Sequence, residues 1–146
     1  MSEATVLFHV SDIHFGYEDR AALDWFAAEV SRQRPALVLC TGDVTMRGTA
    51  REFAAAGRWL AALDAPVRVD PGNHDVPYYW YPLARVFRPW RHYRDMVRAV
   101  GTRAELADVA VIPLRTVAAF QWRLNLSKGR VAAADLDAAL QGLSHH

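Results

Sequence analysis

The chain has 146 residues, 52% of them hydrophobic and 23% charged, with a formal net charge of +1 at pH 7. These values are typical of a globular protein with one sizeable core, so we expect residues 1–146 to form a single domain. The near-neutral balance provides no overall attraction to nucleic acid or to membranes, and no apolar run reaches the roughly 20 residues that span a bilayer.

In chain order, the first half alternates short apolar runs with amphipathic stretches. Strands are predicted at 5–10, 36–40 and 65–69, and helices at 20–33 and 50–63. The apolar runs are typical of strands that are buried on both faces. The order strand, helix, strand, helix, strand predicts an α/β fold with a parallel sheet built by right-handed crossovers. The polar loops that follow the three strands would then meet at one edge of the sheet.

Capping residues mark the starts of both predicted helices. Asp19 is placed as the N-cap of the first, and Thr49 with Glu52 forms a capping box for the second. Cys40 lies inside the second apolar run, which predicts a buried and inert thiol. One cysteine cannot form a disulfide within the chain. Because the N-terminus also lacks the basic region of a signal peptide, we expect a cytoplasmic protein.

Residues 78–103 differ in composition from the first half, because they contain six Arg, one Asp and several aromatic residues. The favoured interpretation is a solvated, lid-like segment in which the Arg stems lie over aromatic rings. A second interpretation is contact with a substrate phosphate through Arg85 and Arg88. A surface that binds single-stranded nucleic acid is the least favoured at a net charge of +1.

The remainder of the chain predicts four more elements. A helix is expected beyond Pro89, two further strands at 108–114 and 116–121, and a C-terminal helix at 132–143. The apolar residues of the last helix recur at spacings of three and four, which places them on one face.

Side chains that bind metal ions follow each of the three strands in the first half. Asp12 and His14 alternate, so in an extended segment they would project to the same side and chelate one cation. Asp43 follows a glycine, and Asn73 and His74 follow Gly72. Each short motif alone is common in caps and turns. Together, at three successive strand ends, they predict a site for Mn, Fe or Zn, in which Asp43 would bridge two ions.

These motifs resemble a known family. The sequences Ser11-Asp12-Ile13-His14-Phe15-Gly16, Thr41-Gly42-Asp43 and Pro71-Gly72-Asn73-His74-Asp75 are similar to the first three signatures of the calcineurin-like metallophosphoesterases. Thr116 and residues 129–131 resemble the bacterial cyclic-nucleotide-phosphodiesterase-like branch. The resemblance implies a two-sheet α/β sandwich that holds a dinuclear metal site.

The resemblance also implies a role for each site residue. Asp12, His14 and Asp43 would hold the first metal ion, and Asp43 with Asn73 would contact the second. His74 would protonate or stabilise the leaving oxygen. A sixth residue, Asp75, would orient His74, an arrangement in which a carboxylate stabilises an imidazolium.

The sequence departs from the family pattern in its second half. The family completes its site with a Gly-His and a later Gly-His-x-His signature, and neither is present; His145 and His146 directly follow a helix. We therefore expect the chain to form the N-terminal βαβαβ half of the sandwich, with further strands and a C-terminal helix. The second half of the sandwich would be missing. Such a chain would hold at most one ion firmly.

Two functions follow as hypotheses. The first is a metal-dependent phosphoesterase that uses a metal-activated water on phosphodiesters, with cyclic nucleotides, nucleic acid and nucleotide-linked lipids all open as substrates. The second is a catalytically incompetent remnant that acts as an interaction module. The oligomeric state stays open.

Overall fold

The computed structural model describes residues 4–78, 81–101, 106, 108–118 and 129–144. Within these residues, three strands form a parallel sheet in the order β1-β2-β3. They are β1 (Leu7–Val10), β2 (Leu37–Thr41) and β3 (Val67–Asp70). Val38 lies at the centre of this register, paired with Phe8 on one side and Val67 on the other. The predicted α/β fold with a parallel sheet is confirmed.

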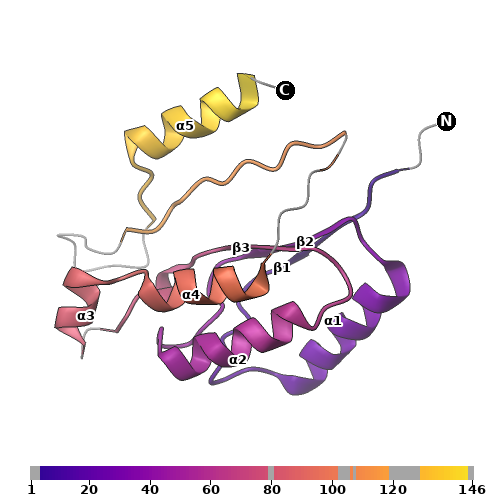
Figure 1. The fold of residues 1–146 in the computed structure, drawn as a ribbon, viewed down its shortest axis with the longest axis horizontal. Coiled ribbons are helices and arrows are strands. Elements are labelled where there is room, and N and C mark those ends of the chain that lie inside the picture. Colours follow the sequence, from indigo (N-terminus) through magenta and orange to yellow (C-terminus); the bar gives the residue numbers. More distant parts are fainter. Residues whose placement is uncertain (1–3, 79–80, 102–105, 107, 119–128, 145–146) are drawn as a thin grey trace.

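Two helices cover one face of the sheet (Figure 1). They are α1 (Arg20–Gln33) and α2 (Ala50–Ala61). The predicted bounds of α1 are confirmed, and Asp19 Oδ1 accepts a hydrogen bond from the Ala22 N–H at 3.2 Å. The predicted capping box of α2 is also present. Because both connections run in the same direction along the sheet, right-handed crossovers place both helices on the same side.

The core lies between the sheet and these helices. Val30 of α1, Val38 of β2 and Leu60 of α2 are fully buried. Cys40 is fully buried as well, and burial raises the pKa of its thiol to about 12, so the prediction of a buried thiol is confirmed.

One detail of the strand prediction is wrong. Residues 7, 8 and 10 of β1 are only half-buried and His9 is exposed. The physical reason is that β1 lies at an edge of the described sheet, with the helix layer on one face. An apolar run does not by itself say how many neighbours a strand has.

Beyond β3 the chain forms short helices. They are the 3-10 helix η1 (Asn73–Asp75), α3 (Pro82–Phe87), α4 (Arg91–Val100) and α5 (Ala133–Ser144). The predicted helices after residue 89 and at the C-terminus are confirmed. The sequence did not predict α3, because Pro82 suggested a break; proline is tolerated in the first turn, where its missing N–H has no helical partner.

Helix α4 is attached to the core through α2 and β3. The Met96 side chain packs against Gly57 of α2. The Tyr93 hydroxyl donates a hydrogen bond of 2.7 Å to the Val69 carbonyl at the end of β3. Burial, followed by the nearby Asp70 carboxylate, raises the pKa of Tyr93 above its usual range. The helix therefore continues the layer formed by α1 and α2.

The two strands predicted after residue 107 are not formed within the described residues. Residues 108–118 run as extended chain on the face of the sheet opposite α1 and α2 (Figure 1). They are held there by single hydrogen bonds, such as that from Arg68 Nη1 to the Val111 carbonyl at 2.8 Å. A strand needs a neighbouring backbone along its whole length, and the described parts of the chain place none beside this segment. Residues 119–121 lie outside the described residues.

Helix α5 leaves its apolar face exposed. The exposed fractions of Leu136, Leu140 and Leu143 are 44%, 54% and 59%. Among the described residues, no helix is both long and apolar enough to cross a membrane.

Candidate metal centre

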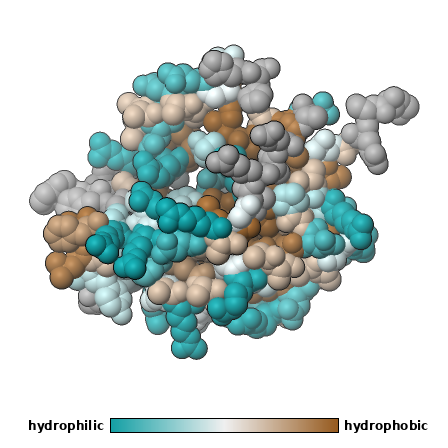
Figure 2. All heavy atoms as spheres, in the orientation of Figure 1, coloured by the Kyte–Doolittle hydropathy of each residue, from teal (hydrophilic) through white to brown (hydrophobic). Residues whose placement is uncertain are grey.

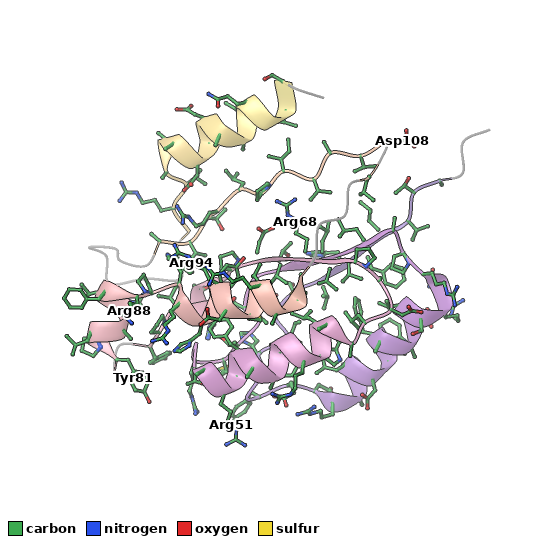
Figure 3. All side chains as sticks on the ribbon, viewed as in Figure 1. Arg51, Arg68, Tyr81, Arg88, Arg94 and Asp108 are labelled. Atoms are coloured by element: carbon green, nitrogen blue, oxygen red, sulfur yellow. The ribbon has the colours of Figure 1, made fainter. Side chains whose placement is uncertain are left out.

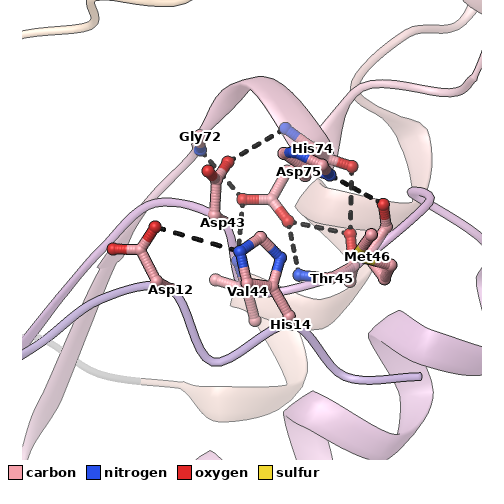
Figure 4. Close-up of polar contacts among 9 residues, drawn as sticks. All are labelled: Asp12, His14, Asp43, Val44, Thr45, Met46, Gly72, His74 and Asp75. Atoms are coloured by element: carbon pink, nitrogen blue, oxygen red, sulfur yellow. Dashed lines mark hydrogen bonds and ion pairs between the residues drawn. The ribbon is translucent and has the colours of Figure 1, made fainter. Parts of the chain in front are cut away.

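The loops that follow β1, β2 and β3 meet at one edge of the sheet, as predicted (Figure 4). Main-chain hydrogen bonds join them in a row. The Asp12 N–H donates to the Gly42 carbonyl at 3.2 Å, and the His14 N–H donates to the Asp43 carbonyl at 3.0 Å. The Gly42 N–H in turn donates to the Asp70 carbonyl at 2.9 Å. The positions of the polar side chains are therefore set by backbone as well as by packing.

Two glycines permit this close approach. Gly42 has φ +89°, in the left-handed region that glycine adopts without strain. A Cβ atom on Gly72 would overlap both the main-chain nitrogen and Oδ1 of Asp43. The turn after β3 therefore lies directly against Asp43, and only glycine fits at position 72.

Asp12, His14 and Asp43 form the candidate metal centre. Each offers one ligand atom, and these atoms lie within 4.8 Å of one another. The closest approach between Asp12 and His14 is 3.9 Å, from Oδ1 to Nε2. Metal–ligand bonds of about 2.0–2.2 Å require the ligand atoms of one ion to lie slightly closer together than these three atoms do. Small rotations of the side chains would bring them to the distances that an ion needs. Two carboxylates and an imidazole suit Mn, Fe or Zn.

The ring of His14 is free to act as a ligand. Its Nδ1 is buried and has no hydrogen-bond partner among the described residues. Its Nε2 faces Asp12 at a distance too long for a hydrogen bond. Buried polar atoms are nearly always paired in proteins, so this unpaired imidazole fits a site that is completed by an ion.

The backbone at these three residues is unusual. Asp12, His14 and Asp43 have φ values of 57°, 49° and 51°, and only Arg34 among the other described non-glycine residues has a positive φ. Each such residue costs roughly 1–2 kcal/mol, and strain of this kind clusters at functional sites. The prediction that Asp12 and His14 project to one side of an extended segment is wrong in its geometry: the left-handed turns bring them together.

His74 lies beside the cluster. Its ring makes an edge contact with the His14 ring, with 4.8 Å between the centroids. Its main-chain N–H donates to Asp43 Oδ1 at 2.9 Å, and its Nδ1 lies 2.8 Å from the Met46 carbonyl. Because a carbonyl only accepts hydrogen bonds, Nδ1 carries a proton, and Nε2 is the nitrogen left for a substrate.

The predicted pairing of Asp75 with the His74 ring is not formed. Asp75 is fully buried, and its oxygens accept hydrogen bonds from the N–H groups of Gly72 at 2.8 Å, Val44 at 3.2 Å and Thr45 at 2.8 Å. The Thr45 hydroxyl donates a further bond at 2.9 Å. The short 3-10 turn directs this side chain inward, toward the amides of the neighbouring loop, so the Met46 carbonyl contacts the imidazole instead.

Asp75 therefore joins the loop after β2 to the turn after β3. Burial raises the pKa of its carboxyl, while the hydrogen bonds from Gly72, Thr45 and Val44 oppose that shift. Sequence inspection missed Thr45 as its main partner. Nothing in the sequence distinguishes a threonine two residues after Gly-Asp from any other loop threonine. The contact with Met46 is made by its main-chain carbonyl, which every residue type has, so no sequence pattern could predict it.

The remaining predicted site residues lie in the expected segments. Asn73 begins η1 and is half-buried. Arg85 on α3 is half-buried and donates from Nη1 to the Pro77 carbonyl at 2.7 Å. Arg88, at the end of α3, is exposed. Their contacts with metal or phosphate stay predictions.

A groove of about 410 Å³ opens beside Asp12. It runs between the end of β1 and helix α1, and its walls include His9, Asp12, Trp25 and Phe26. The groove thus adjoins Asp12, one of the three residues of the candidate metal centre.

Comparison with known proteins agrees with the motifs. A family model described as calcineurin-like phosphoesterase matches residues 5–125. The glycerophosphodiester phosphodiesterase GpdQ of Enterobacter lignolyticus is 30% identical over 81 residues, which cover 48% of this chain and 29% of that protein. The 3',5'-cyclic adenosine monophosphate phosphodiesterase CpdA of Pseudomonas aeruginosa is 34% identical over 83 residues, which cover 49% and 30%. The matches thus span less than a third of the length of these relatives.

Proposed function

The chain belongs to the calcineurin-like phosphoesterase family, and from this premise we propose that it is a metal-dependent phosphoesterase that hydrolyses phosphodiesters. The observation that carries the proposal is the convergence of Asp12, His14 and Asp43. Two similar proteins are named as phosphodiesterases, which supports a diester as the substrate class. The cytoplasmic location stays a prediction, based on the single cysteine and the N-terminal sequence.

The metal ions belong at the carboxylate–imidazole cluster. Asp12, His14 and Asp43 would hold one ion firmly, and Asp43 with Asn73 would contact a second more weakly. Bound Mn, Fe or Zn ions lower the pKa of a water and neutralise phosphate charge. The His74 N–H donates a hydrogen bond to Oδ1 of Asp43. This bond orients the Asp43 carboxylate, which both ions would share, because it holds one of its oxygens toward the turn after β3.

His74 is the proposed proton donor to the leaving oxygen. The Met46 carbonyl fixes the ring with Nδ1 protonated, so Nε2 exchanges the proton. The ring lies in edge contact with His14, which supports a role beside the proposed metal site. Asp75 acts one step away, as a positioning residue, because it holds the turn that carries His74 against the loop after β2.

The substrate phosphate would sit at the cluster with its organic group in the groove beside Asp12. Arg85 and Arg88 are proposed phosphate contacts from α3. Nucleic acid enters this proposal only as a substrate, and the identity of the alcohol group is left to experiment.

The test combines metal content with turnover. The purified chain is loaded with Mn²⁺, its bound metal is measured by elemental analysis, and hydrolysis of bis(4-nitrophenyl) phosphate is followed. We expect bound Mn²⁺ and Mn-dependent hydrolysis. Asp43→Ala should lose both, since Asp43 serves both ions, whereas Asp24→Ala, an exposed carboxylate on α1, should lose neither.

A second variant separates the roles within the site. His74→Ala should keep the metal and reduce turnover by about 10²–10⁴-fold, the range for a lost general acid. Loss of metal would instead make His74 a ligand. Metal binding without hydrolysis by the unmodified chain would favour the alternative, a non-catalytic interaction module, and no metal binding would overturn the site itself.

A further inference from the structure

Helix α3 exposes nearly all of its apolar side chains. The exposed fractions of Leu83, Val86 and Phe87 are 72%, 62% and 75%, and that of the preceding Tyr81 is 57%. Residues 83, 86 and 87 have the i, i+3, i+4 spacing that places side chains on one side of a helix. No residue of α3 is buried. Figure 2 shows the resulting brown, apolar surface at the end of the molecule where α3 lies, beside hydrophilic atoms.

The same part of the chain carries a concentrated positive charge. Residues 78–103 hold six of the 17 Lys and Arg residues but only one of the 16 Asp and Glu residues. The rest of the chain therefore has 11 basic and 15 acidic residues. The net charge of +1 conceals a basic segment on an acidic body, and such local asymmetry determines which surface faces a charged partner.

Several of these arginines point into solvent. Arg88, Arg91 and Arg94 are exposed and form no ion pair with any described residue. Figure 3 labels Tyr81, Arg88 and Arg94 on this end of the molecule, and Arg51 on α2 as a basic residue away from it. Arg98, by contrast, lies 3.6 Å from Asp95 one turn earlier on α4.

We propose that residues 81–94, the α3 docking segment, attach the protein to an anionic lipid surface. Leu83, Val86 and Phe87 enter the boundary between headgroups and acyl chains, and Arg88 and Arg91 contact lipid phosphates. Basic residues beside exposed Leu and Phe are the composition of interfacial segments. Positive charge close to the surface strengthens the attachment to anionic lipids. Leu83, Val86 and Phe87 take no part in the proposed reaction, whereas Arg88 is also a proposed contact for the substrate phosphate.

The side chains favour lipid over the other basic-surface partners. Single-stranded nucleic acid is bound by stacking of bases on flat rings; Tyr81 and Phe87 offer such rings, but the equally exposed Leu83 and Val86 do not and would gain nothing from stacking. A second copy of the chain would have to pair two surfaces of like charge in a symmetric contact. An anionic bilayer satisfies both the apolar side chains and the arginines at once.

Vesicle co-sedimentation tests the proposal. The chain is mixed with phosphatidylcholine vesicles, with or without about 30% phosphatidylglycerol, whose negative charge attracts basic segments. We expect binding to the anionic vesicles alone, weakened by salt. The double variant Leu83→Ser/Phe87→Ser and the double variant Arg88→Glu/Arg91→Glu should each weaken binding by about tenfold or more.

Matched controls keep the test falsifiable. Leu140→Ser/Leu143→Ser on α5 removes two similarly exposed leucines, and Arg51→Glu reverses an exposed charge on α2; neither should change binding by more than about twofold. Circular dichroism verifies that each variant is folded. Absence of vesicle binding, or equal losses in the controls, overturns the proposal. So does light scattering that shows a dimer dispersed by Leu83→Ser/Phe87→Ser, or binding of single-stranded DNA in place of vesicles.

Discussion

Residues 4–78 and the described part of 81–144 both form helices with an apolar face, yet in the second region only α4 packs that face against the core. Within the described residues, Met96 is the single buried apolar residue beyond position 78. Helices α3 and α5 bury none. The first region has a sheet for its helices to cover, while the second has extended chain. An amphipathic pattern thus forms helices in both regions, but α3 and α5 add nothing to the core, because burial needs a surface of matching shape.

Two polar interactions, one from each region, also differ, because the first is buried and the second lies at the surface. In the first region, the buried Asp75 carboxylate accepts four hydrogen bonds from two loops. In the second, Arg115 and Asp135 form an ion pair of 3.2 Å at the surface. Charged groups in water contribute little to stability, whereas buried ones are costly to disturb. The candidate metal centre therefore lies in the region with the buried core.

Truncating a leucine should give the largest difference in stability between the two regions. Leu60→Ala removes a fully buried side chain of α2 and should lower the free energy of unfolding by about 2–5 kcal/mol. Leu140→Ala on α5, where the side chain is 54% exposed, should lower it by less than about 0.5 kcal/mol. Urea denaturation followed by circular dichroism measures both. Similar losses from the two variants would show that α5 is packed in solution.

The buried carboxylate should give the next largest effect. Asp75→Ala leaves the N–H groups of Gly72, Val44 and Thr45 without their acceptor, and we expect a loss of roughly 2–4 kcal/mol in the same assay. Asp135→Ala removes only a surface ion pair and should cost about 0–1 kcal/mol. An Asp75→Ala variant as stable as Asp135→Ala would disprove the joining role of Asp75.

Glycine substitutions give the smallest but sharpest contrast. Gly72→Ala places a Cβ atom onto Asp43 and should destabilise the protein by about 1–3 kcal/mol and weaken Mn²⁺ binding. In Gly142→Ala the new atom would meet only the Ile112 side chain, at 3.3 Å from Cδ1 and 3.5 Å from Cγ2, and the helix should gain about 0.5–1 kcal/mol. In one urea denaturation series, we therefore expect the free energy of unfolding to fall for Gly72→Ala and to rise for Gly142→Ala. A tolerated alanine at position 72 would refute the close approach of the two loops.

Local signals in the sequence were sufficient for much of the first region. The start of α1 was predicted because Asp19 bonds an amide three residues away, and the start of α2 because Thr49 and Glu52 cap each other. The meeting of the three loops followed from the strand order, since parallel strands end at one edge. These features depend on neighbours in sequence or on a general rule of topology.

Other features had no such signal. The strands expected at 108–114 and 116–121 depended on a neighbouring strand, and residues 108–118 have no such partner among the described residues. The partner of the His74 ring is the main-chain carbonyl of Met46, 28 residues earlier, and any residue type would supply that oxygen.

The sequence by itself determined the types of ligand, their order along the chain and the glycines that allow close approach. Only the tertiary structure decided how they meet: left-handed turns at Asp12, His14 and Asp43, and the inward direction of Asp75. It also decided which apolar faces stay exposed, at α3 and α5. The physical reason is that ligand chemistry resides in single side chains. Distance, burial and hydrogen-bond partner belong to pairs of residues that the fold alone brings together.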